Sequence, residues 1–270
     1  MRIYAIAVFL FLYIPIGIIV LFSFNAGRHA SELRGLSVQW YSKALSNPFV
    51  SDAFFTSLII ALSVAVLSTL LGTTAALALQ RLKGPLRTFF DGMIYVSVMV
   101  PGIVIGIATL VALVTVFDFL NPLIASFWPE GMKPPKLHMG YASVIAAHTL
   151  FTMSMVIILV RARISGMDRT LIEASMDLYA TPWRTFYQVT LPQIFPAILA
   201  GFLLSFTFSF DDFIISFFVA GPNTTLPIYI FSSIRRGITP EVNAIGTMVL
   251  VTSLIILMAA QYALHRRDIR

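Results

Sequence analysis

The sequence predicts an all-α integral membrane protein with six transmembrane helices, organised as a single domain over residues 1–270. Composition is the first reason: 58% of the residues are hydrophobic and 11% are charged, whereas about 25% are charged in a soluble domain. A chain with so few polar side chains cannot cover a soluble fold with them, so lipid must be its solvent. Long uncharged runs and the distribution of basic residues support the same fold class. The chain has no cysteine, which excludes disulfides and thiolate chemistry.

Six uncharged runs are long enough to cross a bilayer, whose core of about 30 Å requires about 20 helical residues. They are residues 3–24, 53–80, 92–117, 137–160, 185–210 and 242–265. The first run contains Pro15 and lacks a cleavage site of small residues, so it is interpreted as a retained span rather than a signal peptide.

A seventh uncharged run, residues 213–234, is interrupted by Gly221, Pro222 and Pro227. Proline breaks a helix, so this run is expected to loop outside the membrane or to re-enter it. The fifth helix is predicted to end near Ala220.

The basic residues set the expected orientation. With six spans and the N-terminus inside, eleven Lys and Arg residues fall on the cytoplasmic side and seven fall outside. Seven spans would place the basic C-terminus outside, against the positive-inside rule. We therefore expect both termini in the cytoplasm, and we attribute the net charge of +6 to this topology rather than to nucleic-acid binding.

The cytoplasmic segment between the fourth and fifth runs, residues 165–192, is called the elbow below. Apolar residues recur at helical spacing in its first half, which indicates a short amphipathic helix. Thr181 followed by Pro182 is typical of an N-cap and the first position of a second helix. Glu173 and Asp177 stand four residues apart, where like charges repel. This favours a cationic partner surface, with a solvated amphipathic loop as the alternative.

Asp211 and Asp212, the acidic pair, lie in the outer half of the fifth span, because Asp211 is 18 residues, about 27 Å of helix, beyond Gln193. A carboxylate at membrane depth usually faces a cavity or a partner. Adjacent helical residues point about 100° apart, so we expect one acid on a solute path and the other in a structural hydrogen bond. Ser205, Ser209 and Asp212 share one helix face, which favours Asp212 on the path. Phe208 is placed there too, as a cation–π partner for an ammonium group; a purely structural role for these side chains is the alternative.

Several function classes are disfavoured. An intramembrane aspartyl enzyme needs two carboxylates that reach one substrate atom. Adjacent helical positions point apart, so the acidic pair fits this class poorly. The chain contains no Gly-x-x-x-x-Gly-Lys-[Ser/Thr] phosphate loop, so any ATPase is expected in a separate polypeptide. No metal or other cofactor is expected in this chain, because none of the four histidines has metal-ligand spacing: His29, His138, His148 and His265.

The elbow resembles the coupling-loop signature of ABC importer permeases. That signature is Glu-Ala-Ala, three residues, Gly, nine residues, Ile, one residue, Leu-Pro, and the elbow keeps its spacing. Ser175 and Tyr179 depart from the family's Ala and Gly, so the turn between the two short helices is expected to be built differently. In that family the elbow docks in a cleft of an ATP-hydrolysing subunit. The resemblance therefore implies coupling roles for Glu173, Ala174, Ser175, Asp177, Tyr179, Leu191 and Pro192.

Within that family the chain is most similar to the second membrane subunit of spermidine/putrescine importers, over residues 204–212, 218–222, 226–229 and 237–244. The resemblance implies the type I importer fold in the bacterial cytoplasmic membrane, with the elbow's coupling helix between spans 4 and 5. It also implies an ATP-binding subunit dimer that uses ATP and Mg²⁺, a second homologous permease subunit, and a periplasmic or extracellular solute-binding protein. The implied polyamine path comprises Asp211, Asp212, Ser209, Ser205, Phe208 and Trp40.

Two alternatives to a polyamine permease stay open. Polyamine permeases often carry an acid just after the proline of the third span, whereas Gly102 follows Pro101 here. A permease for a different small organic solute is therefore one alternative, and an ATPase-independent channel or secondary transporter is the other. Gly102 and Gly106 instead form a Gly-x-x-x-Gly pair, which predicts close helix packing.

Overall fold

The structure, a computed structural model, describes residues 2–27, 32–129, 131–168, 170–237 and 239–268. These residues are helical apart from turns, loops and one isolated antiparallel bridge between Asn25 and Leu36. They form two compact units, Met1–Phe54 with Ile228–Arg270 and Phe55–Pro227, called unit 1 and unit 2 below. The single-domain organisation stays a prediction, since two helices, α3 and α11, each belong to both units.

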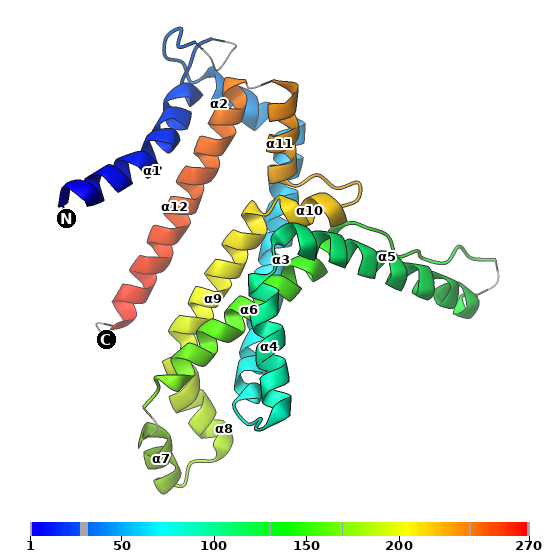
Figure 1. Ribbon diagram of the computed structural model, residues 1–270, viewed down its shortest axis with the longest axis vertical. Coiled ribbons are helices and arrows are strands. Elements are labelled where there is room, and N and C mark those ends of the chain that lie inside the picture. Colours follow the sequence, from blue (N-terminus) through cyan, green and yellow to red (C-terminus); the bar gives the residue numbers. More distant parts are fainter. Residues whose placement is uncertain (1, 28–31, 130, 169, 238, 269–270) are drawn as a thin grey trace. The chain divides into compact units, whose positions relative to one another are not determined.

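Unit 1 is built around two long helices. Its elements are α1 (Arg2–Ser23), α2 (Gln39–Ser46), the start of α3 (Pro48–Leu79), most of α11 (Leu226–Arg236) and α12 (Pro240–Asp268). Helix α12 contacts both α1 and α2 (Figure 1). The side chain of Asn47 caps α3 through Phe49 N and donates hydrogen bonds to Tyr229 Oη and Glu241 Oε1.

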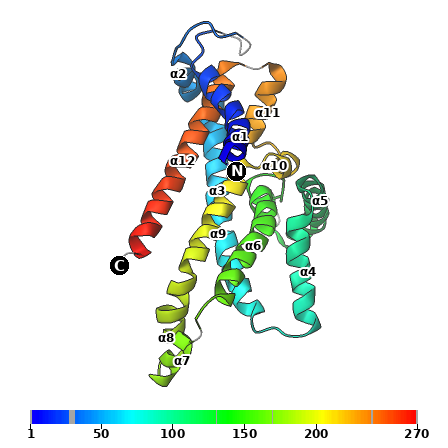
Figure 2. The ribbon, with the colours of Figure 1, turned by 60° about the vertical axis from the view of Figure 1, so that its left-hand side comes forward.

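Unit 2 holds the remaining elements. They are the rest of α3, α4 (Pro85–Met99), α5 (Gly102–Phe127), α6 (Tyr141–Ser165), α7 (Thr170–Asp177), α8 (Pro182–Thr185), the π-helix η1 (Phe186–Thr190), α9 (Leu191–Asp211) and α10 (Ile214–Val219). Helices α6 and α9 lie side by side, as Figure 2 also shows. Helix α3 runs along α6, with Ser68 Oγ hydrogen-bonded to Thr152 Oγ1 at 2.7 Å.

The prediction of six membrane helices is confirmed. Among the described residues, five helical stretches are long and apolar enough to span: Tyr4–Ser23, Pro48–Leu79, Gly102–Phe127, Tyr141–Ser165 and Pro182–Asp211. The apolar part of α12, Pro240–Ile255, supplies the sixth. The seventh run forms only α10 and α11, of 6 and 11 residues, and neither reaches the required length of about 20 residues.

Two predicted helices have different limits in the structure. The run 92–117 is not one helix, because the backbone breaks before Pro101 and divides it between α4 and α5. Proline disfavours the helical conformation of the residue before it, and Val100 is extended with φ −69° and ψ 132°. The fifth helix ends at Asp211 rather than near Ala220, because Asp212 is also extended, with φ −70° and ψ 120°.

The centre of unit 2 is packed through one valine and two glycines. Val156 of α6 is fully buried between α3 and α9. A Cβ added at Gly72 of α3 would lie 2.8 Å from Val156 Cβ, and one at Gly201 of α9 would lie 3.2 Å from Val156 Cγ1. Small residues of this kind let membrane helices approach closely.

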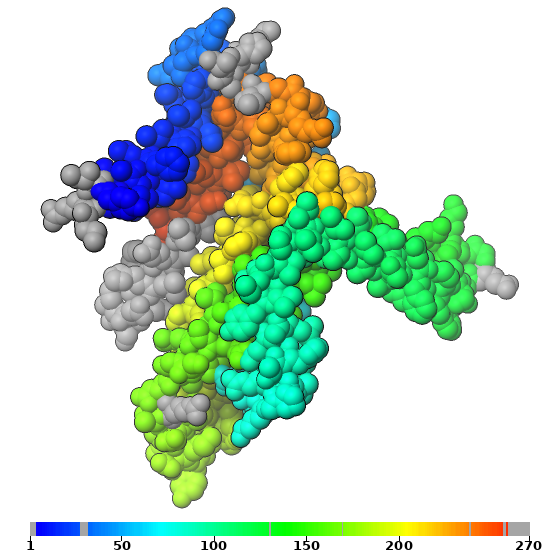
Figure 3. Space-filling view, in the orientation of Figure 1, coloured from blue at the N-terminus to red at the C-terminus, as the bar shows by residue number. Residues whose placement is uncertain are grey.

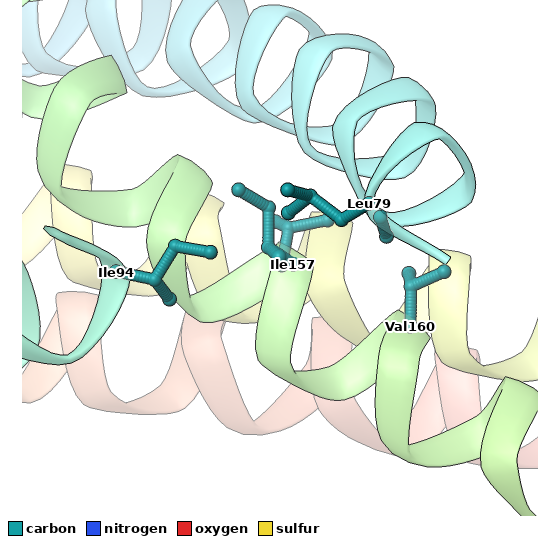
Figure 4. Close-up of a cluster of buried hydrophobic side chains, with 6 residues drawn as sticks. Leu79, Ile94, Ile157 and Val160 are labelled. Atoms are coloured by element: carbon teal, nitrogen blue, oxygen red, sulfur yellow. The ribbon is translucent and has the colours of Figure 1, made fainter. Parts of the chain in front are cut away.

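An aliphatic cluster continues this core where α3, α4 and α6 meet. Figure 4 shows Leu79 of α3 and Ile94 of α4 close to Ile157 and Val160 of α6. All four side chains are buried.

Helix α5 extends away from the rest of unit 2 in the space-filling view (Figure 3), and its contacts are mainly with α10. Gly106 lies against α10, where an added Cβ would be 2.8 Å from Phe218 Cδ2. Close packing at the Gly-x-x-x-Gly pair is thereby confirmed at Gly106, with the short helix α10 as the partner.

Candidate functional site

The acidic pair lies at the break between α9 and α10. Asp211 is the last residue of α9, and the extended backbone of Asp212 redirects the chain into α10. Asp212 Oδ2 accepts a hydrogen bond from the backbone N–H of Ser216 at 3.0 Å. This N–H belongs to the first turn of α10, where backbone donors lack intrahelical partners. Asp212 therefore has a structural role in starting α10.

A buried histidine of α6 contacts both sides of this break. His148 is 2% exposed, and its Nδ1 lies 2.8 Å from Ser209 Oγ of α9. Its Nε2 lies 3.2 Å from Ser216 Oγ and 3.2 Å from Asp212 Oδ2. One imidazole ring thus joins the last turn of α9, the extended residue and α10.

The two acids differ in their surroundings. The side chain of Asp212 is 22% exposed and engaged by His148, whereas Asp211 is exposed. The structural hydrogen bond expected for one member of the pair is therefore made by Asp212. This favours Asp211 as the acid available to a cation, the reverse of the assignment that helix geometry alone suggested.

The other predicted path residues are placed differently. Ser205 and Ser209 are buried, and Ser205 Oγ has no hydrogen-bond partner among the described residues. Phe208 is 42% exposed and meets Phe151 edge to face at 5.9 Å between ring centroids. Trp40 belongs to unit 1, so its relation to the acidic pair stays a prediction.

Trp40 has structural partners of its own within unit 1. Its side chain is 6% exposed, and its Nε1 donates a hydrogen bond to the carbonyl of Asn25 at 2.8 Å. Lys43 Nζ lies 4.4 Å from the centroid of the indole ring, within the range of a cation–π contact.

Sequence reasoning examined His148 only as a metal ligand and missed its contacts with the acidic pair. The available signal was an ionisable side chain near the middle of the uncharged run 137–160, which is a functional hypothesis by default. The described residues contain no group of three or more His, Asp or Glu side chains that would hold a metal ion.

The elbow forms two short helices, as predicted. Helix α7 ends in a Schellman motif, in which Ala180 N donates to Ser175 O at 3.1 Å and Tyr179 N donates to Met176 O at 2.9 Å. Tyr179 occupies the left-handed position of this motif with φ 56° and is the only non-glycine residue with positive φ in the described part of the chain. The turn is therefore built with the geometry that glycine favours, although a tyrosine occupies it.

Side-chain hydrogen bonds hold the two elbow helices together. Thr181 caps α8 by accepting from Arg184 N at 3.4 Å, with Pro182 at the first helical position. Ser175 Oγ of α7 and Thr185 Oγ1 of α8 are hydrogen-bonded at 2.9 Å. Helix α8 continues through η1 into α9, so the elbow is joined to the fifth span without a loop.

A carboxylate also stabilises the start of α7. Asp168 Oδ1 accepts hydrogen bonds from Thr170 Oγ1 at 2.8 Å and from Thr170 N at 2.9 Å. These bonds hold the pKa of Asp168 below its usual value, so this side chain stays ionised at neutral pH.

The predicted coupling residues form part of the elbow's surface. Glu173, Ala174, Asp177 and Pro192 are exposed, Ser175 and Leu191 are partly buried, and Tyr179 is 97% exposed. Their coupling roles stay a prediction.

Two contacts fasten neighbouring helices of unit 2 near the elbow. Arg161 of α6 forms an ion pair with Asp91 of α4, and Arg87 Nε lies 3.7 Å from the same carboxylate. Arg163 Nε donates to the backbone carbonyl of Gln193 in α9 at 2.8 Å.

The family of binding-protein-dependent transport system inner membrane components matches residues 68–270. The chain is 36% identical over 263 residues to the putrescine transport system permease protein PotI of Escherichia coli K12, covering 96% of this chain and 89% of that protein. It is 35% identical over 256 residues to the spermidine/putrescine transport system permease protein PotC of the same strain, covering 94% and 90%. With PotC of Haemophilus influenzae the identity is 33% over 262 residues, covering 97% and 95%.

Solved structures share the fold. A bacterial ABC transporter involved in the import of the acidic polysaccharide alginate superposes with a TM-score of 0.76 at 16% identity, covering 98% of this chain and 94% of that one. The same kind of transporter in complex with an alginate pentasaccharide-bound periplasmic protein gives a TM-score of 0.73 at 17% identity, covering 98% and 93%. With apolar spans, an elbow of matching spacing and relatives aligned over almost its whole length, this chain belongs to the binding-protein-dependent transport system inner membrane components.

Proposed function

We propose that this chain is a permease subunit of an ATP-driven importer whose solute is a polyamine such as putrescine or spermidine. The observation that carries the proposal is the similarity, over 96% and 94% of the chain, to permease proteins named for putrescine and for spermidine/putrescine transport. The acidic pair supports it, because a solute with two or three ammonium groups needs anionic partners where it leaves water.

Asp211 is the residue best suited to meet such a cation. It is exposed at the end of α9, at the outer end of an apolar span where a carboxylate calls for a partner or a water-filled path. Phe208, one turn earlier on the same helix and partly exposed, adds an aromatic ring of the kind that attracts ammonium groups.

The remaining machinery is assigned to other subunits. The chain has no phosphate-binding loop, so a separate ATPase dimer supplies ATP and Mg²⁺ chemistry. The elbow, with Glu173 and Asp177 exposed on α7, is the element on which this ATPase dimer docks. A second homologous permease completes the path, and a solute-binding protein delivers the solute to the outer loops. In this scheme both termini of the chain are cytoplasmic.

In this mechanism the chain itself supplies a path and a mechanical connection. Closure of the ATPase dimer moves the elbow, and because α8, η1 and α9 are continuous, the movement reaches the acidic pair at the far end of α9. The path then opens outward, and Asp211 accepts the cation from the binding protein.

Uptake of labelled spermidine and putrescine by the complete complex, with unlabelled competitors, tests the solute. We expect ATP-dependent uptake in wild type and a rise in KM of about tenfold in Asp211→Asn, since one lost charge contact of about 1.4 kcal/mol changes affinity tenfold. Asp52→Asn, which changes an exposed acid of α3, serves as the control and should behave as wild type. Uptake of another solute but no polyamine would overturn the polyamine assignment while leaving family membership intact.

Docking of the elbow is tested by Glu173→Arg. We expect this variant to lose the co-purifying ATPase and the ATP dependence of uptake, whereas Glu32→Arg, a charge reversal in the predicted outer loop, should retain both. Normal assembly and normal coupled ATP hydrolysis in Glu173→Arg would contradict the docking role. Uptake that persists without any ATPase would favour a channel or a secondary transporter.

A further inference from the structure

We propose that His148 is a positioning residue that holds Asp212 against the protein at the break between α9 and α10 and thereby leaves Asp211 as the carboxylate that meets the solute. The inference deepens the proposed function and rests on it for the identity of the solute. It concerns a buried ionisable side chain of α6 that neither the elbow nor the sequence motifs explain.

The hydrogen-bonding capacity of the imidazole ring fits this role. Since a carboxylate accepts hydrogen bonds when it is ionised, the tautomer that suits this geometry has its N–H at His148 Nε2, 3.2 Å from Asp212 Oδ2. Nδ1 is then free to accept from the Ser209 hydroxyl at 2.8 Å. The ring thus bonds α9 through one nitrogen and the start of α10 through the other.

Burial makes these bonds hard to replace with water. His148 is 2% exposed, Ser209 is 5% exposed and Ser216 is 1% exposed. A buried polar group that loses its partner bears its full desolvation penalty. Loss of the ring therefore leaves unsatisfied groups on both helices, and it removes the contact that keeps Asp212 from turning away.

Helix α10 is fastened to α6 at its other end as well. Ser143 Oγ donates a hydrogen bond to the carbonyl of Val219 at 2.7 Å, and Val219 is the last residue of α10. Ser143 therefore fixes α10 without touching either acid, which makes it a matched control for His148.

The surroundings of the two acids complete the argument. Asp212 bonds both the ring and the Ser216 N–H. Among the described residues, Asp211 has no hydrogen-bond or ion-pair partner, and it is exposed. A cation that arrives at this break therefore finds one engaged carboxylate and one free carboxylate.

Two amide variants of His148 test the two ring nitrogens one at a time. In His148→Gln the amide nitrogen reaches the position of Nε2, so the bond toward Asp212 and Ser216 can be kept. In His148→Asn the amide reaches only the position of Nδ1, so the bond to Ser209 can be kept while Asp212 is released. Both variants place an amide in the same buried site, so a general cost of burial affects them alike.

Two measurements on the assembled importer test the proposal. In hydrogen exchange of the peptide that contains α10, we expect His148→Asn to exchange about tenfold faster than wild type, and His148→Gln to stay within about threefold, since a charge-assisted hydrogen bond changes an equilibrium about tenfold or more. In uptake of labelled spermidine, we expect His148→Asn to raise KM about tenfold with a smaller change in kcat, and His148→Gln to restore KM. Ser143→Ala should speed exchange in α10 and leave KM unchanged.

Equal effects of His148→Asn and His148→Gln, or no effect of His148→Asn, would overturn the proposal. So would a rise in KM in Ser143→Ala as large as that in His148→Asn, because general loosening of α10 would then explain the result. A different result would contradict the proposed function, namely that wild type imports no polyamine. In that case the exchange comparison between the two His148 variants would still decide whether the ring holds the break.

Discussion

Tyr179 stands where the coupling-loop signature has glycine, and its backbone adopts the left-handed conformation that glycine favours. The resemblance to the coupling-loop signature places glycine at this position, and the structure explains the preference, since the residue has φ 56°. An L-residue in the left-handed region costs about 1–2 kcal/mol. The hydrogen bonds of the Schellman motif and the link between Ser175 and Thr185 hold the turn in spite of that cost.

Tyr179→Gly is expected to stabilise the elbow by about 1 kcal/mol, because glycine adopts positive φ without steric penalty. Hydrogen exchange of the α7 amides should slow about fivefold, which corresponds to that free energy. Tyr179→Ala is the control, since it removes the ring and keeps the unfavourable φ. Equal protection in the alanine and glycine variants would show that the ring, not the backbone, limits stability.

At the scale of the elements, unit 2 is held by close approaches and by ion pairs between particular helices. Gly72 and Gly201 allow α3 and α9 to pack on Val156 from two sides. Near the elbow, Asp91 and Arg161 join α4 to α6. The close approaches depend on the absence of a side chain, and the ion pairs depend on charge. Each kind of contact is therefore tested by its own substitutions.

Gly72→Ala should destabilise the protein by about 1–3 kcal/mol, the usual range for an overpacked core, because the added methyl meets Val156 Cβ at 2.8 Å and Met153 O at 3.1 Å. Gly201→Ala should be nearly neutral. Its closest contact of 3.2 Å is with a valine methyl, and alanine gains up to about 1 kcal/mol in helix propensity. Thermal unfolding in detergent measures both, and Val156→Ala should partly rescue Gly72→Ala but not improve Gly201→Ala.

Asp91→Arg should lower the free energy of unfolding by about 2 kcal/mol, the scale of a hydrogen bond to a charged group, because Asp91 and Arg161 are only 27% and 23% exposed and the new cation faces two arginines. The exchanged pair, Asp91→Arg with Arg161→Asp, should recover part of the loss. Arg87→Gln is the control and should cost under about 0.5 kcal/mol, since Arg87 is half exposed at 3.7 Å. A double variant no more stable than Asp91→Arg would exclude a direct charge interaction between α4 and α6.

At the scale of the whole molecule, the number of spans decides the orientation of the C-terminus. The run 213–234 forms helices of 6 and 11 residues, about 9 and 17 Å long, which are too short to cross the bilayer. An even number of spans places both ends on the same side, and the excess of basic residues in alternate segments predicts that this side is the cytoplasm.

A reporter fused after Arg270 tests this orientation. A fluorescent protein, which matures in the cytoplasm, should be active there, and an alkaline phosphatase, which requires disulfides formed outside, should be inactive. The reverse pattern would require an additional span. Fusion of the same reporters within residues 221–225, between α10 and α11, is the control and should give the opposite result.

Most of the helices were predictable because their signals are local. Long uncharged runs indicated the spans, and Thr181 with Pro182 indicated the start of α8. The break at Pro101 was missed because proline also occurs inside membrane helices, where neighbouring groups satisfy the freed backbone; Pro15 lies inside α1. The role of His148 was missed because its partners Ser209 and Ser216 lie 61 and 68 positions away in sequence.

By itself, the sequence determined that the chain lies in a membrane, how many spans it has, and that the elbow forms two short helices, because hydrophobic length, charge and motif spacing are properties read along the chain. Only the tertiary structure decided how the two adjacent acids differ. Helix geometry placed both on one continuous helix and favoured Asp212 for the solute. The backbone instead leaves the helix at Asp212, and packing of α6 brings His148 to that residue, so Asp212 is engaged by the protein and Asp211 is exposed.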